Sequence, residues 1–161
     1  MERKILELLE ENSRYSVEDL AIITELSKNE VEEIIADLEK RQVICGYKTL
    51  INWDKVDDKE LVRALIEVKV TPQRGEGFDK IARRIYHFNE VKAVYLMSGG
   101  FDLTVIVEGS SMKEVAMFVS QKLATLDSVL STATHFVLNK YKDYGVIFEK
   151  QKKDERVMIT L

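Results

Sequence analysis

Hydrophobic residues recur at helical spacing through the first forty residues. Ile5, Leu8 and Leu9 lie three and one residues apart among charged residues in 2–11, which predicts an amphipathic helix. Ser16 and Ser27 each precede another apolar stripe and have a carboxylate three residues on, as helix N-caps do. Two short helices joined by so tight a turn must cross steeply. The pattern therefore predicts a helix-turn-helix.

A β-rich stretch follows these helices. Residues 43–51 are mostly β-branched, aromatic or aliphatic and include Gly46, which suits a turn or bulge. We expect a β-hairpin here, the wing of a winged helix-turn-helix, so the first domain covers residues 1–51. Residues 52–60 are polar and charged and predict a linker.

The elements expected after the linker follow a different order. Apolar and polar residues alternate over 62–70, a helical stripe covers 78–85, and strand-like runs occupy 91–97 and 101–107. Ser111 caps another helix, and a last strand covers roughly 129–138. This β-α-β-β-α-β order predicts a ferredoxin-like domain over 61–145 and an α+β fold class. Residues 146–161 are expected to be a tail whose alternating end could pair with a sheet edge.

In this fold two helices cover one face of the sheet and leave the other bare. We expect the bare face to carry a set of apolar residues: Leu65, Val94, Leu96, Ile106, Leu130, Phe136 and Leu138. An exposed apolar sheet face of this extent predicts burial against a second copy, and hence a homodimer.

Composition narrows the classes of function. One cysteine excludes an internal disulfide and a multi-cysteine zinc site, and two histidines leave few groups for catalysis. We expect no enzyme, metal or cofactor. The longest apolar runs are far shorter than a membrane span, and the N-terminus has no signal-peptide core, so a cytoplasmic protein without a membrane partner is expected.

Charge differs between the two halves. Residues 1–60 hold nine basic and sixteen acidic residues, a net charge of −7, whereas the remainder carries +3 of the overall −4. Such asymmetry favours two units with different roles.

The order and spacing of several short stretches resemble the leucine-responsive and asparagine-regulator (Lrp/AsnC) family of prokaryotic transcription regulators. The similarity extends to about Gly145, and the matching stretches are residues 5–14, 20–21, 26–27 with Val31, 38–39, 43–47, 98–103, 129–134, 137–138 and Lys142. The resemblance implies a sequence-specific binder of double-stranded DNA that forms dimers, and often tetramers or octamers of dimers. It also implies a small-molecule effector, an amino acid or related metabolite, bound at the interfaces between dimers.

The second helix of a helix-turn-helix enters the major groove, where its first residues reach base edges. By position these are Ser27, Lys28, Asn29, Glu32 and Glu33. Asn29 suits adenine, whereas Lys28 suits guanine or phosphate. Two further residues, Arg14 and Lys48, are expected to contact the DNA backbone.

The helix-turn-helix over residues 1–41, here called the reading head, departs from the family in its charge. Family members usually carry arginines at the positions of Glu32 and Glu33 and a glycine at that of Glu25. Residues 1–41 hold six basic and twelve acidic residues, a net charge of −6. Because phosphate contacts supply the sequence-independent part of affinity, we expect weak binding that salt reduces steeply.

The effector site is expected at the turn between the two central strands. Its residues are Met97, Gly99, Gly100, Phe101 and Asp102, with Thr132 and Thr134 on the last strand. Glycines let backbone amides approach a carboxylate, and Asp102 can accept hydrogen bonds from an α-ammonium group. A purely structural role is the alternative, in which the glycines permit a tight hairpin and Asp102 satisfies turn amides. The resemblance favours effector binding and predicts that Asp102→Ala abolishes the ligand response without affecting dimerisation.

Three functions remain open at this point. The first is a metabolite-responsive transcription regulator. The second is a ligand-binding or partner-modulating protein of the same fold with weak or no DNA binding. The third is an enzyme like the sirohaem decarboxylases, which resemble this fold but need catalytic histidine and arginine groups.

Overall fold

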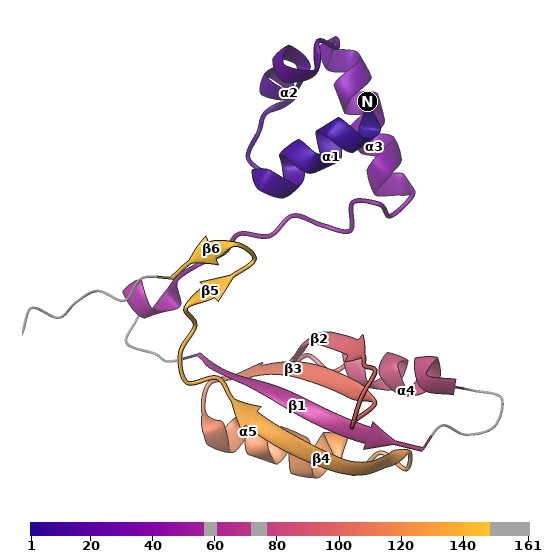
Figure 1. Cartoon of the computed structure of the whole chain (residues 1–161), viewed down its shortest axis with the longest axis vertical. Coiled ribbons are helices and arrows are strands. Elements are labelled where there is room, and N and C mark those ends of the chain that lie inside the picture. The colour runs from indigo at the N-terminus through magenta and orange to yellow at the C-terminus, as the bar shows by residue number, and fades with distance from the viewer. Residues whose placement is uncertain (57–60, 72–76, 149–161) are drawn as a thin grey trace, which may run out of the picture. The chain divides into compact units, whose positions relative to one another are not determined.

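The computed structural model describes residues 1–56, 61–71 and 77–148, and the chain divides into two compact units after Ile51 (Figure 1). The first unit holds the helices α1 (Glu2–Glu11), α2 (Val17–Thr24) and α3 (Lys28–Lys40). One small core joins them, built on the buried Ile5, Leu20, Ala21 and Val31. The three predicted helices are thus confirmed. In the described part of the chain, no helix is both long and apolar enough to cross a membrane.

Capping boxes begin α2 and α3, as predicted. The Ser16 hydroxyl accepts the Asp19 backbone N–H at 3.1 Å, and the Ser16 N–H donates to the Asp19 carboxylate at 3.0 Å. Ser27 and Glu30 make the same exchange at 3.3 and 2.8 Å. Because each carboxylate also accepts its serine hydroxyl, the pKa of Asp19 and that of Glu30 lie below their ordinary values.

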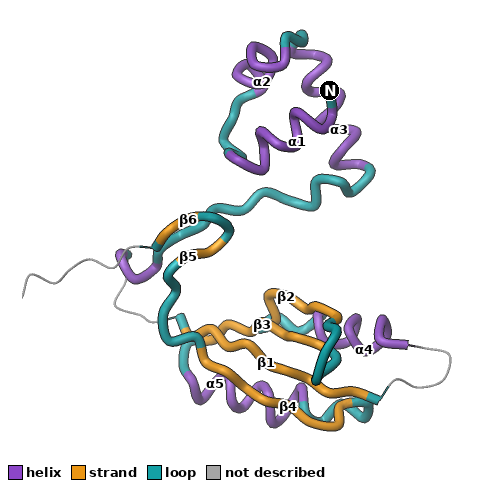
Figure 2. The backbone as a smooth tube through the Cα atoms, in the orientation of Figure 1, coloured by secondary structure: helices purple, strands orange, loops and turns teal. Residues whose placement is uncertain are grey.

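The predicted hairpin over residues 43–51 is wrong, because no strand forms there (Figure 2). The first residues of this stretch instead complete the end of α3. Gln42 adopts a left-handed φ of 57°, and the N–H groups of Gln42 and Val43 donate to the carbonyls of Glu39 and Leu38. This is a Schellman motif, which satisfies the last carbonyls of a helix. The rest of the segment continues without a β-partner.

The second unit contains the predicted ferredoxin-like order. Its strands are β1 (Val62–Val70), β2 (Val91–Leu96), β3 (Leu103–Gly109) and β4 (Val129–Phe136). Its helices are α4 (Gly77–Tyr86) and α5 (Met112–Phe118), which continues as the π-helical turn η2 (Val119–Leu123). The strands pair antiparallel in the order β2-β3-β1-β4, which places β1 and β3 at the centre.

Both helices lie on the same side of the sheet (Figure 1). The core beneath them includes Ala64, Ile66 and Val68 of β1 and Val105 and Val107 of β3, all fully buried. Residues on the alternate positions of these strands therefore face the bare side.

Three residues expected on the bare face lie on the helix side instead. Val94 pairs with Val105, Leu96 with Leu103, and Phe136 with Ala64, and all three partners belong to the core. A bulge between Val91 and Ala93 shifts the alternation of β2 by one residue, which the sequence pattern does not reveal.

The bare face is consequently mixed rather than apolar. Leu65 and Ile106 lie opposite one another, whereas Glu67 lies opposite Thr104. Near them, His135 Nε2 lies 3.5 Å from a Glu67 carboxylate oxygen. Leu130 and Leu138 are exposed, at 65% and 86%, the latter beyond the end of β4.

A separate two-stranded hairpin follows β4. It consists of β5 (Lys142–Asp143) and β6 (Val146–Ile147), with positive φ at the two turn residues, Tyr144 and Gly145. Residues 146–147 therefore pair with β5, not with an edge of the four-stranded sheet. The remainder of the predicted edge strand, from 149 on, lies outside the described residues. Figure 2 shows the hairpin apart from the sheet strands.

Arg63 ties this hairpin to the start of β1. Its Nε donates to Glu108 Oε1 at 2.8 Å, and its Nη1 lies 3.3 Å from Asp143 Oδ2. Lys140 also pairs with Asp143, at 3.1 Å. Burial alone would raise the pKa of Asp143, but the hydrogen bonds from Lys140 and Arg63 hold it below its ordinary value.

Candidate functional site

The turn between α2 and α3 depends on one left-handed residue. Glu25 follows α2 with φ 59° and ψ 30°, and its N–H donates to the Ala21 carbonyl. A non-glycine residue in this region costs about 1 kcal/mol or more. This geometry suits the glycine that the resemblance implies at this position, and this chain holds the turn with a glutamate.

The first turn of α3 exposes a short polar surface. Lys28, Asn29 and Glu32 are all exposed, so they are available to a groove. Ser27 is exposed as well, but its hydroxyl serves the capping box. Arg14 lies before α2 and Lys48 in the irregular segment after α3, both exposed.

Lys28 is not a free cation. Its Nζ lies 2.7 Å from Glu18 Oε1, an ion pair that joins the second residue of α2 to the first of α3. The hydrogen bond from Lys28 lowers the pKa of Glu18. A phosphate or a guanine must therefore compete with Glu18 for this lysine. The sequence pattern gives no sign of this pair, because the two residues are ten positions apart.

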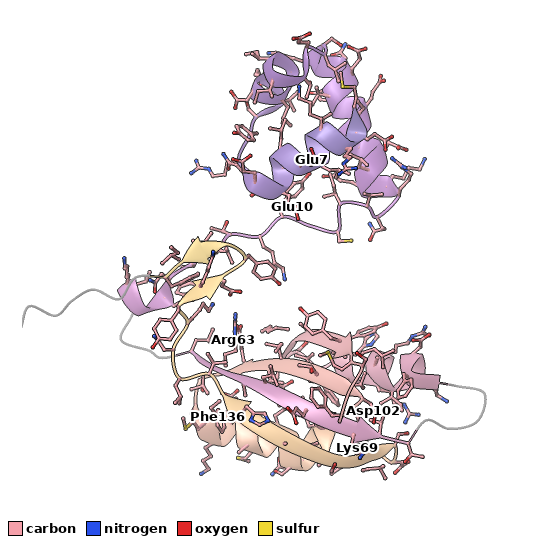
Figure 3. All side chains as sticks on the ribbon, in the orientation of Figure 1. Glu7, Glu10, Arg63, Lys69, Asp102 and Phe136 are labelled. Carbon is pink, nitrogen blue, oxygen red and sulfur yellow. The ribbon has the colours of Figure 1, made fainter. Side chains whose placement is uncertain are left out.

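The loop from Met97 to Asp102 joins the edge strand β2 to the central strand β3, not two central strands as expected, and backbone hydrogen bonds close it. The Met97 N–H donates to the Asp102 carbonyl at 2.8 Å, and the Asp102 N–H donates to the Val68 carbonyl at 3.0 Å. The Asp102 side chain accepts the Val70 N–H through Oδ2 at 2.8 Å. Figure 3 shows Asp102 near Lys69, at the opposite end of β1 from Arg63. Asp102 thus fastens the loop to the last residues of β1.

The backbone conformation requires a glycine at only one of the two glycine positions of this loop. Gly99 has φ +147°, a conformation that strains other residues, so the turn itself needs a glycine. Gly100 has no such φ, and a Cβ there would meet nothing within 4 Å. The turn geometry therefore explains Gly99 but not Gly100. Met97 is 41% exposed and Phe101 is half-buried.

Thr132 and Thr134 lie on β4, opposite Val68 and Ile66 of β1. Both are half-buried and share the helix side of the sheet with those partners. Because Leu103 also pairs with Val68, Thr132 is two strand spacings from Leu103, about 10 Å. Thr132 and the loop thus occupy the same end of the sheet, and Thr134 lies two residues farther along β4.

The two histidines lie on opposite sides of the sheet. His87, just after α4, donates from Nδ1 to the Arg83 carbonyl at 2.6 Å, whereas His135 faces Glu67 on the bare side. No group of three or more His, Cys, Asp and Glu side chains among the described residues could hold a metal ion.

Two family models match the chain. Residues 63–147 match the Lrp/AsnC ligand-binding domain, which is more than half of the chain, and residues 1–44 match a winged helix-turn-helix DNA-binding model. The matched regions contain the 97–102 loop and the α2–α3 pair, respectively.

Two relatives of similar length match almost the whole chain, and both are transcription regulators. The chain is 54% identical over 159 residues to YugG, an HTH-type transcriptional regulator of Bacillus subtilis, covering 99% of this chain and 96% of that protein. It is 30% identical over 147 residues to the leucine-responsive regulatory protein of Haemophilus influenzae, covering 91% and 87%.

A solved structure shares the fold over most of the chain. The feast or famine regulatory protein of M. tuberculosis, solved with L-methionine, superposes with a TM-score of 0.69 at 25% identity, covering 88% of this chain and 92% of that one. With its helix-turn-helix head and its ferredoxin-like ligand-binding domain, this chain belongs to the Lrp/AsnC family of DNA-binding transcription regulators.

Proposed function

We propose that this regulator binds a free amino acid at the 97–102 loop and changes its affinity for DNA in response. The observation that carries the proposal is the open backbone at Gly100, next to a carboxylate held at the end of a central strand. The related protein solved with L-methionine supports an α-amino acid as the ligand class.

Each end of an amino acid has a suitable group in this loop. Asp102 uses Oδ2 for the Val70 N–H, and a carboxylate has further lone pairs that can accept an ammonium group. The amides around Gly99 and Gly100 can donate to the ligand carboxylate. The residues proposed for this site are Met97, Gly99, Gly100, Phe101 and Asp102, with Thr132 and Thr134 at the same end of the sheet.

We further propose that the chain is a homodimer formed through the bare sheet face and assembles into tetramers or octamers. Leu65 and Ile106 supply an apolar centre for this face. Around it, Arg63 is paired with Glu108, and Glu67 lies 3.5 Å from His135 Nε2. Paired charges can be buried at a much lower cost than isolated ones.

The DNA contacts proposed for the head are those of Arg14, Ser27, Lys28, Asn29, Glu32 and Lys48. Asn29 is exposed on the first turn of α3, which supports direct contact with a base edge. Lys28 must leave Glu18 to take part. The protein is proposed to act in the cytoplasm on double-stranded DNA.

A second candidate function is ligand sensing with weak or no DNA binding. The net charge of −6 over residues 1–41 and the engagement of Lys28 by Glu18 favour it. Catalysis is not proposed, because the two histidines lie on opposite sides of the sheet and cannot converge on one substrate.

The test combines ligand and DNA measurements. A thermal-shift screen of the twenty amino acids identifies binders, and the mass of the assembly is then measured with each. Mobility shifts follow on the region upstream of the protein's own gene, with and without ligand, at several salt concentrations. We expect one or more amino acids to raise the melting temperature and alter DNA affinity. A duplex bound equally with and without every binder would refute ligand-dependent regulation, and no binding at low salt would favour the second candidate.

A further inference from the structure

Four basic residues form a ridge along the outer side of α4. Lys80 lies three and four residues before the consecutive Arg83 and Arg84, so the three share one side of α4, and His87 follows just after the end of the helix. All four are exposed, whereas Ile81 and Ile85 of the same helix are buried in the core. The ridge therefore points away from the sheet and into solvent.

The two arginines of this ridge have no ion-pair partner among the described residues. Asp79, the one acidic residue of α4, pairs with neither of them in the described part of the structure. The next carboxylate after the helix, Glu90, is taken by Lys122 of η2. An unneutralised pair of guanidinium groups is thus presented on one surface.

Most basic side chains of the reading head, unlike Arg83 and Arg84, already have partners within the same unit. Arg3 pairs with Glu7, Lys28 with Glu18, and Arg41 with Glu2 and Asp37. In addition, the Lys4 ammonium donates to the Ile23 carbonyl. Of the six basic residues in 1–41, four are therefore engaged within an acidic unit, and few remain to neutralise phosphates.

We propose that the α4 ridge is a second DNA contact, which binds the phosphate backbone without reading sequence. The inference rests on the proposed DNA-binding function, and it answers the charge deficit of the head. Arginine forms bidentate hydrogen bonds with phosphate, and each neutralised phosphate releases counterions from the duplex. The α3 surface then supplies sequence preference, and α4 supplies a share of the affinity.

The occupant is DNA rather than an acidic surface of a second copy because the chain is a DNA-binding regulator whose head supplies few free cations. Arg83 and Arg84 are consecutive, so their side chains diverge around the helix and can reach different phosphates of a duplex. Binding to a second copy is the competing outcome, and the experiment separates the two.

The experiment measures the salt dependence of DNA binding by the full chain. The double variant Arg83→Gln/Arg84→Gln is compared with wild type on the upstream duplex and on a random duplex of equal length. The control, Lys113→Gln/Lys142→Gln, removes two exposed charges from α5 and β5. If both arginines bind phosphate, the slope of log K against log salt falls in magnitude by about 2, and affinity at 0.1 M salt falls by about 60-fold on both duplexes.

The control is expected to keep the wild-type slope, and both variants should keep the wild-type mass and amino-acid affinity. An unchanged slope in the arginine variant overturns the proposal and leaves the proposed function standing. An equal loss of salt slope and DNA affinity in the control variant overturns the proposal, because the effect would then come from net charge. A change in the mass of the DNA-free arginine variant overturns it in favour of a contact between copies. Failure of wild type to bind any duplex would overturn both proposals.

Discussion

Replacing Asp102 should separate a structural role from a ligand-binding one. The Asp102 carboxylate accepts the Val70 N–H at 2.8 Å, and Val70 is 5% exposed. Asp102→Ala would leave this donor without a partner, which costs about 1–3 kcal/mol of the free energy of unfolding. Asp102→Asn keeps an oxygen acceptor at the same position, so it should cost less, about 0.5–1 kcal/mol.

The two variants should behave alike toward a ligand. If the charge of Asp102 holds the ammonium group of an amino acid, both lose binding although the asparagine variant stays close to wild type in stability. Urea unfolding measures the stability of each variant. Titration calorimetry with the amino acids found by screening measures its ligand affinity. Wild-type affinity in the Asp102→Asn protein would refute the ammonium role, and an alanine variant as stable as wild type would refute the structural one. The mass of the assembly should be the same in all three proteins.

Other perturbations test the head and the bare face. Glu18→Gln should release Lys28 and raise the salt slope of DNA binding by about 1 if Lys28 reaches a phosphate; an unchanged slope would exclude that contact. Because the pKa of Glu30 is lower in the folded chain, its carboxylate stabilises the fold above pH 4.5, and this contribution is lost as the pH falls through the lowered value. The urea midpoint should therefore fall on acidification, and Glu30→Gln should flatten that fall; a variant with the wild-type profile would contradict it. Leu65→Lys places a charge at the centre of the bare face and should shift sedimentation from dimer to monomer, whereas a dimeric variant would place the interface elsewhere.

Much of the fold follows from local patterns that the sequence displays. The capping boxes at Ser16 and Ser27 fix the starts of α2 and α3, and the alternation over 62–70 identifies β1 and its buried side. These signals depend on residues a few positions apart, so they can be recognised without knowing the tertiary contacts.

The errors arose where distant contacts or backbone geometry decide the outcome. The bulge after Val91 reversed the sides of β2, and the polar Thr132 and Thr134 concealed which side of β4 is buried. The hairpin expected over 43–51 does not form, and its first residues instead complete the end of α3. In the candidate sites, the residues of the 97–102 loop could be named in advance, but the Asp102–Val70 bond and the Lys28–Glu18 pair could not.

The anchoring of β1 at both ends limits how a signal can leave the loop. Asp102 binds its last residue, and Arg63, its second residue, binds β3 and the β5–β6 hairpin. Nine residues of strand span about 30 Å, and partners on both edges make β1 stiff against bending. Because β1 is held on both edges, we expect a displacement of Asp102 to shift β1 together with its neighbouring strands rather than to bend it. The β5–β6 hairpin, which Arg63 holds to β1, would then move with the sheet when the loop moves.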